Sequence, residues 1–405
     1  MIVCGALVLR VLYTVLEARH LGGLGDYTYF HRVAGLIADG HGFTNPFLAG
    51  RGEYEPTALH PPLWPLLLSG SSALGGTGEL AHKLVGAVVG TGTVAVIGLL
   101  GRRVGGSTVG LTAAAIAAAY PLFIGADGSL MSESLYGLLV ATALLLALRL
   151  MDRPAAAVAG ALGVTIGLAA LTRTEGLAYL PLLVLPTAWL AGADLRRRVT
   201  LAAVAFGAAL VVIAPWAVRN TSAFDRFVPI STNEATVLAG ANCGPVYGGT
   251  DIGGWRLDCI SPSRTVDEGE QAARWRREGL DYMFDNRGRL PKVVTARVLR
   301  TWDLFPPGRV VVNEGRAHWI AELETIAYFL LLPLALAGAL LLRRRRELVV
   351  LLAPLVIVTL VSAYGWGLTR FRHAADIAIV VLAAVALVEL ARRVSARRRL
   401  QSCPQ

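Results

Sequence analysis

The chain has 405 residues, of which 55% are hydrophobic and only 16% are charged. About a quarter of the residues of a soluble globular domain are usually charged, so this composition excludes an ordinary soluble protein. The formal net charge of +10 comes from short arginine clusters between apolar runs, a pattern typical of the cytoplasmic loops of membrane proteins rather than of nucleic-acid binding.

Apolar runs close to the length that crosses a bilayer, about 20 residues, recur along the whole chain. We predict about ten spans, the first of which is retained rather than cleaved as a signal peptide. With both termini in the cytoplasm, every arginine cluster falls on a cytoplasmic connection. The predicted spans are residues 1–18, 82–101, 108–125, 132–149, 155–171, 176–194, 199–217, 319–342, 347–363 and 374–391.

The first extracytoplasmic connection, residues 19–81, is expected to lie on the membrane surface. HRVAGLIADG (31–40) is typical of a short amphipathic helix that ends at Gly40. HPPLWPLLLSG (60–70) is apolar but too short and too rich in proline to span, which favours an interfacial helix. The aromatic side chains of this connection are expected to form an interfacial belt, with stacking on sugars as the alternative.

The second long extracytoplasmic connection, residues 218–318, holds two of the four cysteines, Cys243 and Cys259. Disulfides persist in an oxidising compartment, so we predict that these two are joined, with two free thiols as the alternative. The connection divides the chain into a transmembrane module, residues 1–217, and C-terminal helices with a basic tail, residues 319–405.

Acids and bases gather at the predicted outer boundary of the membrane, whereas the inner boundary carries mainly arginine. Charges at membrane depth cost about 2.5–3.5 kcal/mol each on insertion, so they usually have a partner or a task. A carboxylate there can act as a general base or bind a metal, and paired arginines can hold a phosphate. The set comprises Asp26, His60, Asp127, Glu133, Arg173, Glu175, Arg219, Arg370, Arg372 and Asp376.

Each of these residues also has a purely structural interpretation. Asp26 can be a solvated loop acid, and Asp127 is expected to be a plain turn residue. Glu133 can be a helix N-terminal acid that the helix dipole favours. Arg173 can form an interfacial ion pair with a neighbouring glutamate, and the two arginines of TRFR can extend to lipid head groups.

The order of the motifs resembles a known family. The first apolar run is followed by GD with aromatic residues, by HPPLWPLLL, by an acid at the head of a later span, by PWAVRN and by a late RFR before an apolar helix. This order, which covers nearly the whole chain, resembles the GT-C membrane glycosyltransferases of the protein O-mannosyltransferase and aminoarabinose-transferase type. The large loop with ANCGPVYGG and GGW is similar to that of actinobacterial members.

The resemblance implies an all-α, GT-C-like bundle of transmembrane helices that transfers a sugar from a polyprenyl-phosphate donor. The reaction would take place on the extracytoplasmic face of the plasma membrane, with inversion at the anomeric carbon. The acceptor would be the hydroxyl of a glycan, a lipid or a protein, and membrane lipids would surround the enzyme. Whether the enzyme is a hexosyl- or a pentosyltransferase is left open.

The resemblance also assigns roles to individual residues. Asp26 matches the catalytic acid of the first loop, which we expect to act as general base. Relatives often carry a second acid directly after it, where this chain has Tyr27, so a divalent metal would have only Asp26 and Glu133 as candidate ligands. The residues matched to donor binding are His60, Glu133, Arg173, Arg370 and Arg372. Arg372, with Arg370 or Arg173, is expected to hold the lipid phosphate.

Two other classes of function compete with this interpretation. A transporter or flippase for a lipid-linked or small polar substrate would also be polytopic, but its inverted repeats and helices broken at the midplane are not evident in the sequence. A non-catalytic membrane scaffold would use the loop at residues 218–318 to bind a partner. The ordered set of motifs favours the enzyme.

Overall fold

The computed structural model describes residues 1–401 apart from residues 24, 193, 262–265 and 306–315. The regular structure of these residues is helical, apart from one isolated bridge between Thr44 and Pro56. Its α-helices are α1 (Ile2–Leu16), α2 (Asp26–Ala38), α3 (Pro46–Ala49), α4 (Leu63–Ala73), α5 (Glu79–Gly105), α6 (Ser107–Ala119), α7 (Pro121–Asp127), α8 (Glu133–Asp152), α9 (Ala156–Ala170), α10 (Leu185–Leu190), α11 (Leu195–Ala223), α12 (Asn233–Ala241), α13 (Glu268–Asp285), α14 (Leu290–Thr301), α15 (His318–Leu341), α16 (Glu347–Tyr364) and α17 (His373–Gln401).

Six of the described helices are long and apolar enough to cross a membrane, as expected for an integral membrane protein. A seventh span results if α6 and α7 count as one helix with a bend of 56°. The bend lies where Pro121 begins α7, because its nitrogen has no hydrogen to donate to the preceding turn. The six are α5, α8, α11, α15, α16 and Thr369–Ala396, which includes most of α17.

The predicted number of about ten spans is not confirmed. α1 and α9 have 15 residues each, fewer than the roughly 20 that cross a bilayer. The predicted span at residues 176–194 is not one α-helix. A 3-10 turn, a π-helical turn and the short α10 follow one another there, and Pro181 and Pro186 each remove a backbone donor from the segment.

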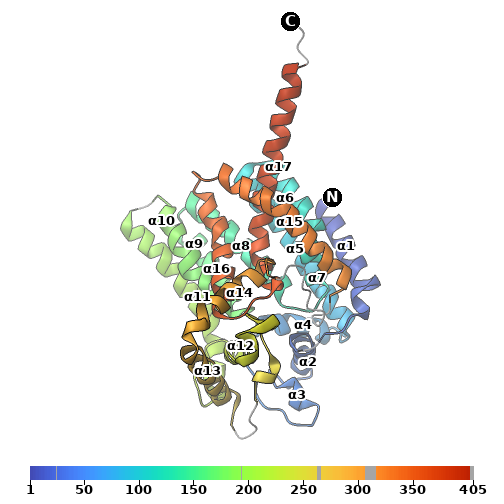
Figure 1. Cartoon of the computed structure of the whole chain (residues 1–405), viewed down its shortest axis with the longest axis vertical. Helices are drawn as coiled ribbons and strands as arrows, with labels where there is room; N and C mark the ends of the chain where they lie inside the picture. The colour runs from blue at the N-terminus through green and yellow to red at the C-terminus, as the bar shows by residue number, and fades with distance from the viewer. Residues whose placement is uncertain (24, 193, 262–265, 306–315, 402–405) are drawn as a thin grey trace.

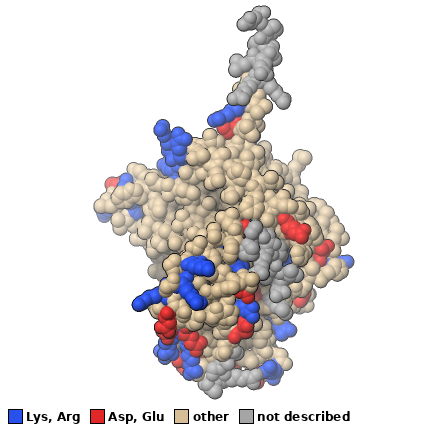
Figure 2. Space-filling model, viewed as in Figure 1, with Lys and Arg blue, Asp and Glu red and all other residues tan. Residues whose placement is uncertain are grey.

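The apolar helix α17 forms the centre of the bundle (Figure 1). Between residues 374 and 388 nearly every side chain is buried, whichever side of the helix it occupies. A helix that is apolar all round is usually buried all round, and α15, α6, α16, α8 and α5 pack against it. Both termini lie toward the same end of the bundle (Figure 1), and a broad band across the bundle carries few charges (Figure 2).

The opposite end of the molecule carries both long connections (Figure 1). The first connection contributes α2, α3 and α4, and the second contributes α12, α13 and α14. The predicted disulfide between Cys243 and Cys259 is present, which confirms that pairing. It ties the segment after α12 to the segment that leads towards α13.

The two short helices expected in the first connection are present as α2 and α4, which pack against each other. α2 begins earlier than predicted, at Asp26, and ends before Gly40, whose φ of +85° suits glycine. Tyr27, Tyr29 and Trp64 are buried within this packing. The expected interfacial belt is therefore wrong for these three aromatic residues, because they fill the space between the helices.

Candidate active site

Asp26 is the first residue of α2, and the residue before it, Gly25, has a φ of +61° that favours glycine. The positive end of a helix dipole favours a carboxylate at this position. The side chain is 33% exposed and contacts two basic groups. Its Oδ1 lies 3.4 Å from Nε2 of His60, and its Oδ2 accepts a hydrogen bond of 3.0 Å from Nη2 of Arg370.

Arg370 connects Asp26 to the second predicted acid, Glu133. It lies on a 3-10 turn, Thr369–Arg372, that directly precedes α17, whereas Glu133 is the first residue of α8. Nε of Arg370 lies 3.5 Å from Oε1 of Glu133, so one guanidinium contacts both carboxylates. Segments that are more than 100 residues apart in the sequence therefore meet at one point.

Arg173 completes the charged cluster. It lies in the turn after α9 and donates a 2.7 Å hydrogen bond from Nη1 to Oε1 of Glu133. Its Nε donates to Glu175. The ring of Phe371 lies 5.6 Å from the guanidinium of Arg173 and 5.6 Å from that of Arg370, so it contacts both of the cations that share Glu133.

Electrostatics favours the ionised form of Asp26. Burial raises the pKa of this carboxyl group, but the charges and hydrogen bonds of His60 and Arg370 outweigh burial and hold the pKa well below its usual range. Asp26 is therefore a carboxylate at neutral pH. While Arg370 is bound to it, this low pKa also makes Asp26 a weak base. A general base works best when its pKa lies near the working pH.

A small cavity adjoins the cluster. Its volume is about 10 Å³, close to the minimum that holds one water molecule. The cluster is therefore closely packed around Arg370 and Glu133. The cavity is lined by Leu122, Ala126, Ser129, Met131, Glu133, Arg316, Arg370 and His373.

Comparison with known proteins identifies the fold. Residues 59–218 match the family model of dolichyl-phosphate-mannose-protein mannosyltransferases. The archaeal oligosaccharyltransferase AglB from Archaeoglobus fulgidus, in complex with an inhibitory peptide and a dolichol-phosphate, is similar in structure, with a TM-score of 0.62 and 17% identity over 100% of this chain and 52% of that one. The chain has a GT-C-type fold. The predicted resemblance to the GT-C membrane glycosyltransferases is therefore confirmed for the fold.

Two further structures are similar to this GT-C chain. The Archaeoglobus fulgidus oligosaccharyltransferase in complex with Zn and sulfate has a TM-score of 0.60 and 19% identity over 98% of this chain and 50% of that one. ArnT from Cupriavidus metallidurans, bound to undecaprenyl phosphate, has a TM-score of 0.45 and 17% identity over 95% of this chain and 77% of that one. The GT-C chain spans about half the length of the oligosaccharyltransferase. No curated protein matches it in sequence.

Arg372 of the GT-C chain lies in a different environment from Arg370. Its side chain is 0% exposed, its Nε lies 3.2 Å from Asp376, and its Nη2 lies 3.5 Å from Glu324. The two arginines are two positions apart on a 3-10 helix, which has three residues per turn, so their side chains point in different directions. The structure does not bring Arg372 to Asp26, although the resemblance predicted that Arg372 lies near the donor phosphate.

The sequence interpretation of Asp127 is wrong. Asp127 is not a plain turn residue but the partner of Arg10 on α1, whose Nε donates to it at 2.7 Å. The side chains of both residues are almost fully buried. Arg10 also donates to two carbonyl oxygens near the end of α6, so this pair holds α1 against the bend of the GT-C bundle.

Sequence reasoning missed Glu268, the first residue of α13. Its carboxylate accepts hydrogen bonds from the hydroxyl of Thr57 (2.6 Å), the backbone N–H of Ala58 (2.8 Å) and the hydroxyl of Thr232 (2.8 Å). Through these bonds, the outer segment of the GT-C chain fixes the loop that presents His60. A lone acid far along the chain, in no motif, gave no signal of this role.

Asp26 and Glu133 do not fit the metal site that the resemblance suggested. The guanidinium of Arg370 contacts both carboxylates and places a positive charge where a cation would bind. Among the described residues, no three histidine, cysteine, aspartate or glutamate side chains come together as a candidate metal site.

Proposed function

We propose that the protein is a membrane glycosyltransferase that moves a sugar from a polyprenyl-phosphate donor to the hydroxyl of an extracytoplasmic acceptor. The observation that carries this proposal is the position of Arg370 between Asp26 and Glu133, in a GT-C fold and beside a segment that matches protein mannosyltransferases. A similar fold that holds a dolichol-phosphate supports a lipid-phosphate donor.

Arg370 and Arg173 are the proposed ligands of the donor phosphate. Arginine presents a planar set of N–H donors that matches phosphate oxygens, and such charge-assisted bonds are stronger than neutral ones. The phosphate would compete with Asp26 for Arg370. As the guanidinium turns to the phosphate, Asp26 loses a stabilising charge, and its pKa rises towards the range of an effective base.

The reaction follows from these two roles. The acceptor oxygen attacks the anomeric carbon of the donor while its proton passes to the carboxylate of Asp26. The bond between that carbon and the phosphate oxygen breaks, and the electron pair leaves with the polyprenyl phosphate. Arg370 and Arg173 stabilise the departing anion in a site of low dielectric, and one displacement inverts the anomeric centre. His60 orients Asp26.

The proposed active site lies on the extracytoplasmic face of the plasma membrane. The disulfide between Cys243 and Cys259 lies at the same end of the molecule as α2, and disulfides persist in oxidising compartments. Both termini lie towards the other end, which we assign to the cytoplasm. The arginine clusters between the spans support this orientation.

The test uses the full chain in vesicles with a polyprenyl-phosphate mannose that is labelled in the sugar. An enzyme releases the label from the lipid, whereas a flippase moves labelled lipid between leaflets without releasing the sugar. Asp26→Asn is expected to lower transfer by about 10²–10⁴-fold, the usual contribution of a general base. Asp39→Asn, an exposed acid at the end of the same helix, is the matched control and should retain full activity. Normal turnover by Asp26→Asn would remove the assignment.

A further inference from the structure

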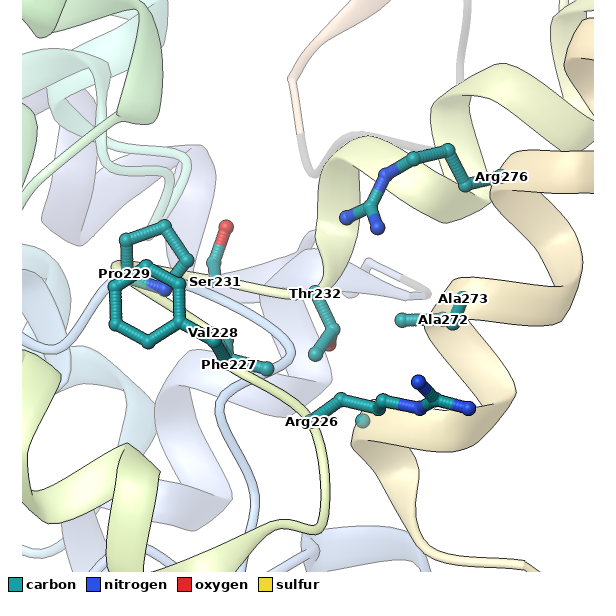
Figure 3. A pocket seen from close by; sticks show the side chains of 10 residues that line it. Arg226, Phe227, Val228, Pro229, Ser231, Thr232, Ala272, Ala273 and Arg276 are labelled. Atoms are coloured by element: carbon teal, nitrogen blue, oxygen red, sulfur yellow. The ribbon is translucent and has the colours of Figure 1, made fainter.

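A second, larger pocket lies outside the charged cluster, between the segment that follows α11 and the first turns of α13. Its volume is about 220 Å³, below the range of about 300–1,000 Å³ that is typical of pockets for drug-sized ligands. It therefore suits a smaller unit, of about the size of one ring with its substituents. Arg226, Phe227, Pro229, Ser231, Thr232 and Arg276 line it together with three small residues of α13 (Figure 3).

The pocket combines an apolar surface with hydrogen-bond donors. The rings of Phe227 and Pro229 lie together at one end, and the side chains of Arg226 and Arg276 lie on opposite sides of Thr232 (Figure 3). Phe227 is 72% exposed, so a ligand can reach its ring. The small residues Gly269, Ala272 and Ala273 leave a flat floor on α13.

Ion pairs hold both arginines but leave donors available. Nε of Arg226 donates to Glu270 at 2.6 Å, and Arg276 donates to Glu234 through Nε and Nη2. Among the described residues, the two Nη atoms of Arg226 have no hydrogen-bond partner. The same holds for Nη1 of Arg276. The pocket thus offers oriented N–H groups to a ligand that is rich in acceptor oxygens.

The wall of the pocket is hydrogen-bonded to two of the segments that carry the charged cluster. The backbone N–H of Thr232 donates to the carbonyl of Ala58, two residues before His60, at 2.9 Å. The hydroxyl of Ser231 lies 3.1 Å from that of Thr174, the residue after Arg173. A ligand in the pocket would therefore lie close to the segments that carry His60 and Arg173.

We propose that this pocket binds a saccharide unit of a carbohydrate acceptor. A sugar ring has an apolar face that suits Phe227 and Pro229, and its many oxygens suit the donors of Arg226 and Arg276. A peptide acceptor would favour an extended groove or a sheet edge with backbone hydrogen bonds, whereas the lining here consists of side chains and a helix face. The inference rests on the proposed glycosyl transfer and adds the class of acceptor.

The experiment measures binding to the full chain in detergent, without donor, so that it is independent of turnover. The probes are a neutral tetrasaccharide, mannotetraose, and an acidic one, tetragalacturonate, with a tetraglutamate peptide for comparison. At least one saccharide should bind, and Phe227→Ala and Arg276→Ala should each weaken it by about tenfold. Phe284→Ala and Arg277→Ala, exposed residues of α13 that do not line the pocket, are the matched controls and should bind normally.

The outcomes separate this inference from the proposed function. Asp26→Asn should lower transfer strongly and keep the affinity for the saccharide. If neither saccharide binds, or if Phe227→Ala and Phe284→Ala bind it equally, the pocket is not the acceptor site, whatever the activity. Binding of tetraglutamate alone would likewise overturn the carbohydrate assignment. If the pocket binds a saccharide and Asp26→Asn still transfers sugar, the proposed catalytic role fails instead.

Discussion

Arg370 and Arg372 lie on the same 3-10 turn, but each belongs to a different cluster of charged residues. The two clusters differ in their access to solvent. Around Arg370, the carboxylate of Asp26 remains 33% exposed. Around Arg372, the arginine and Asp376 are both 0% exposed, and the Tyr328 ring lies 3.6 Å from the guanidinium. The same residue types therefore form one cluster that a ligand can reach and another that it cannot.

The comparison separates the two reasons for which charges occur at membrane depth. A charge that is fully enclosed must be neutralised by its neighbours, as Arg372 is by Asp376 and Glu324. A charge in a binding site must be able to exchange its partner for a ligand. We therefore expect substitutions in the enclosed cluster around Arg372 to affect stability, and substitutions in the accessible cluster around Arg370 to affect turnover.

The largest effect on stability is expected for Arg372→Ala. The change removes the cation and leaves Asp376 and Glu324 without it in a buried site, which typically costs about 3–5 kcal/mol. Thermal unfolding of the purified protein measures the loss. The matched variant Arg344→Ala removes an arginine from an exposed loop and should unfold at the temperature of the parent. A stable Arg372→Ala protein with weak donor binding would instead place Arg372 in the donor site.

Arg370→Gln is expected to affect turnover more than stability. Loss of a charge-assisted bond to the phosphate is worth about 1.5–3 kcal/mol, or roughly 10–150-fold in affinity for the donor. Titration with undecaprenyl phosphate measures this loss without turnover, and the unfolding temperature should change less than for Arg372→Ala. Unchanged donor affinity would show that Arg370 serves only to hold Asp26 and Glu133.

The sequence predicted the members of the outer cluster better than their geometry. The predicted topology put Asp26, Glu133 and Arg370 at one boundary of the membrane, and the structure brings the three side chains into contact. Which arginine of TRFR reaches Asp26 depends on the local 3-10 turn, and no periodic pattern marks such a turn. The predicted role of Asp26 as the base stays a prediction.

The fold shows the same division between what composition determines and what local geometry determines. The helical class and the disulfide followed from composition and from topology, and both are confirmed. The number of spans did not follow, since prolines divide apolar runs into pieces that hydropathy alone joins. Glu268 could not be predicted either, because its partners lie about 210 residues earlier in the chain.

Glu268→Ala should have a moderate effect. The carboxylate accepts bonds from Thr57, Ala58 and Thr232, and burial raises its pKa. Without it, the loop that carries His60 loses its link to α13, and we expect kcat to fall by about tenfold, equivalent to roughly 1.4 kcal/mol. Glu268→Gln keeps an acceptor oxygen and should recover much of the rate. Equal loss of kcat in both variants would contradict a positioning role.

The smallest effect expected is a difference between two pH profiles. The profile of kcat/KM reports the free enzyme and that of kcat reports the bound complex. In the free enzyme, burial raises the pKa of Asp26, but the lowering by His60 and Arg370 is larger. The carboxylate is therefore protonated only at a pH well below the ordinary pKa of about 4. If the donor phosphate withdraws Arg370, that pKa rises on binding. The acid limb of kcat should then lie at a higher pH than that of kcat/KM.

The variant Arg370→Gln sharpens this test. Without the guanidinium, the pKa of Asp26 is already raised in the free enzyme, so the limb of kcat/KM should move up in pH towards that of kcat. The carboxylate is present above its pKa and is lost as the pH falls through it, so a raised pKa means a loss of activity that begins at higher pH. Coincident limbs in the parent protein would mean that Arg370 stays on Asp26 throughout turnover. In that case Asp26 would act as a fixed negative charge at the anomeric centre rather than as a base.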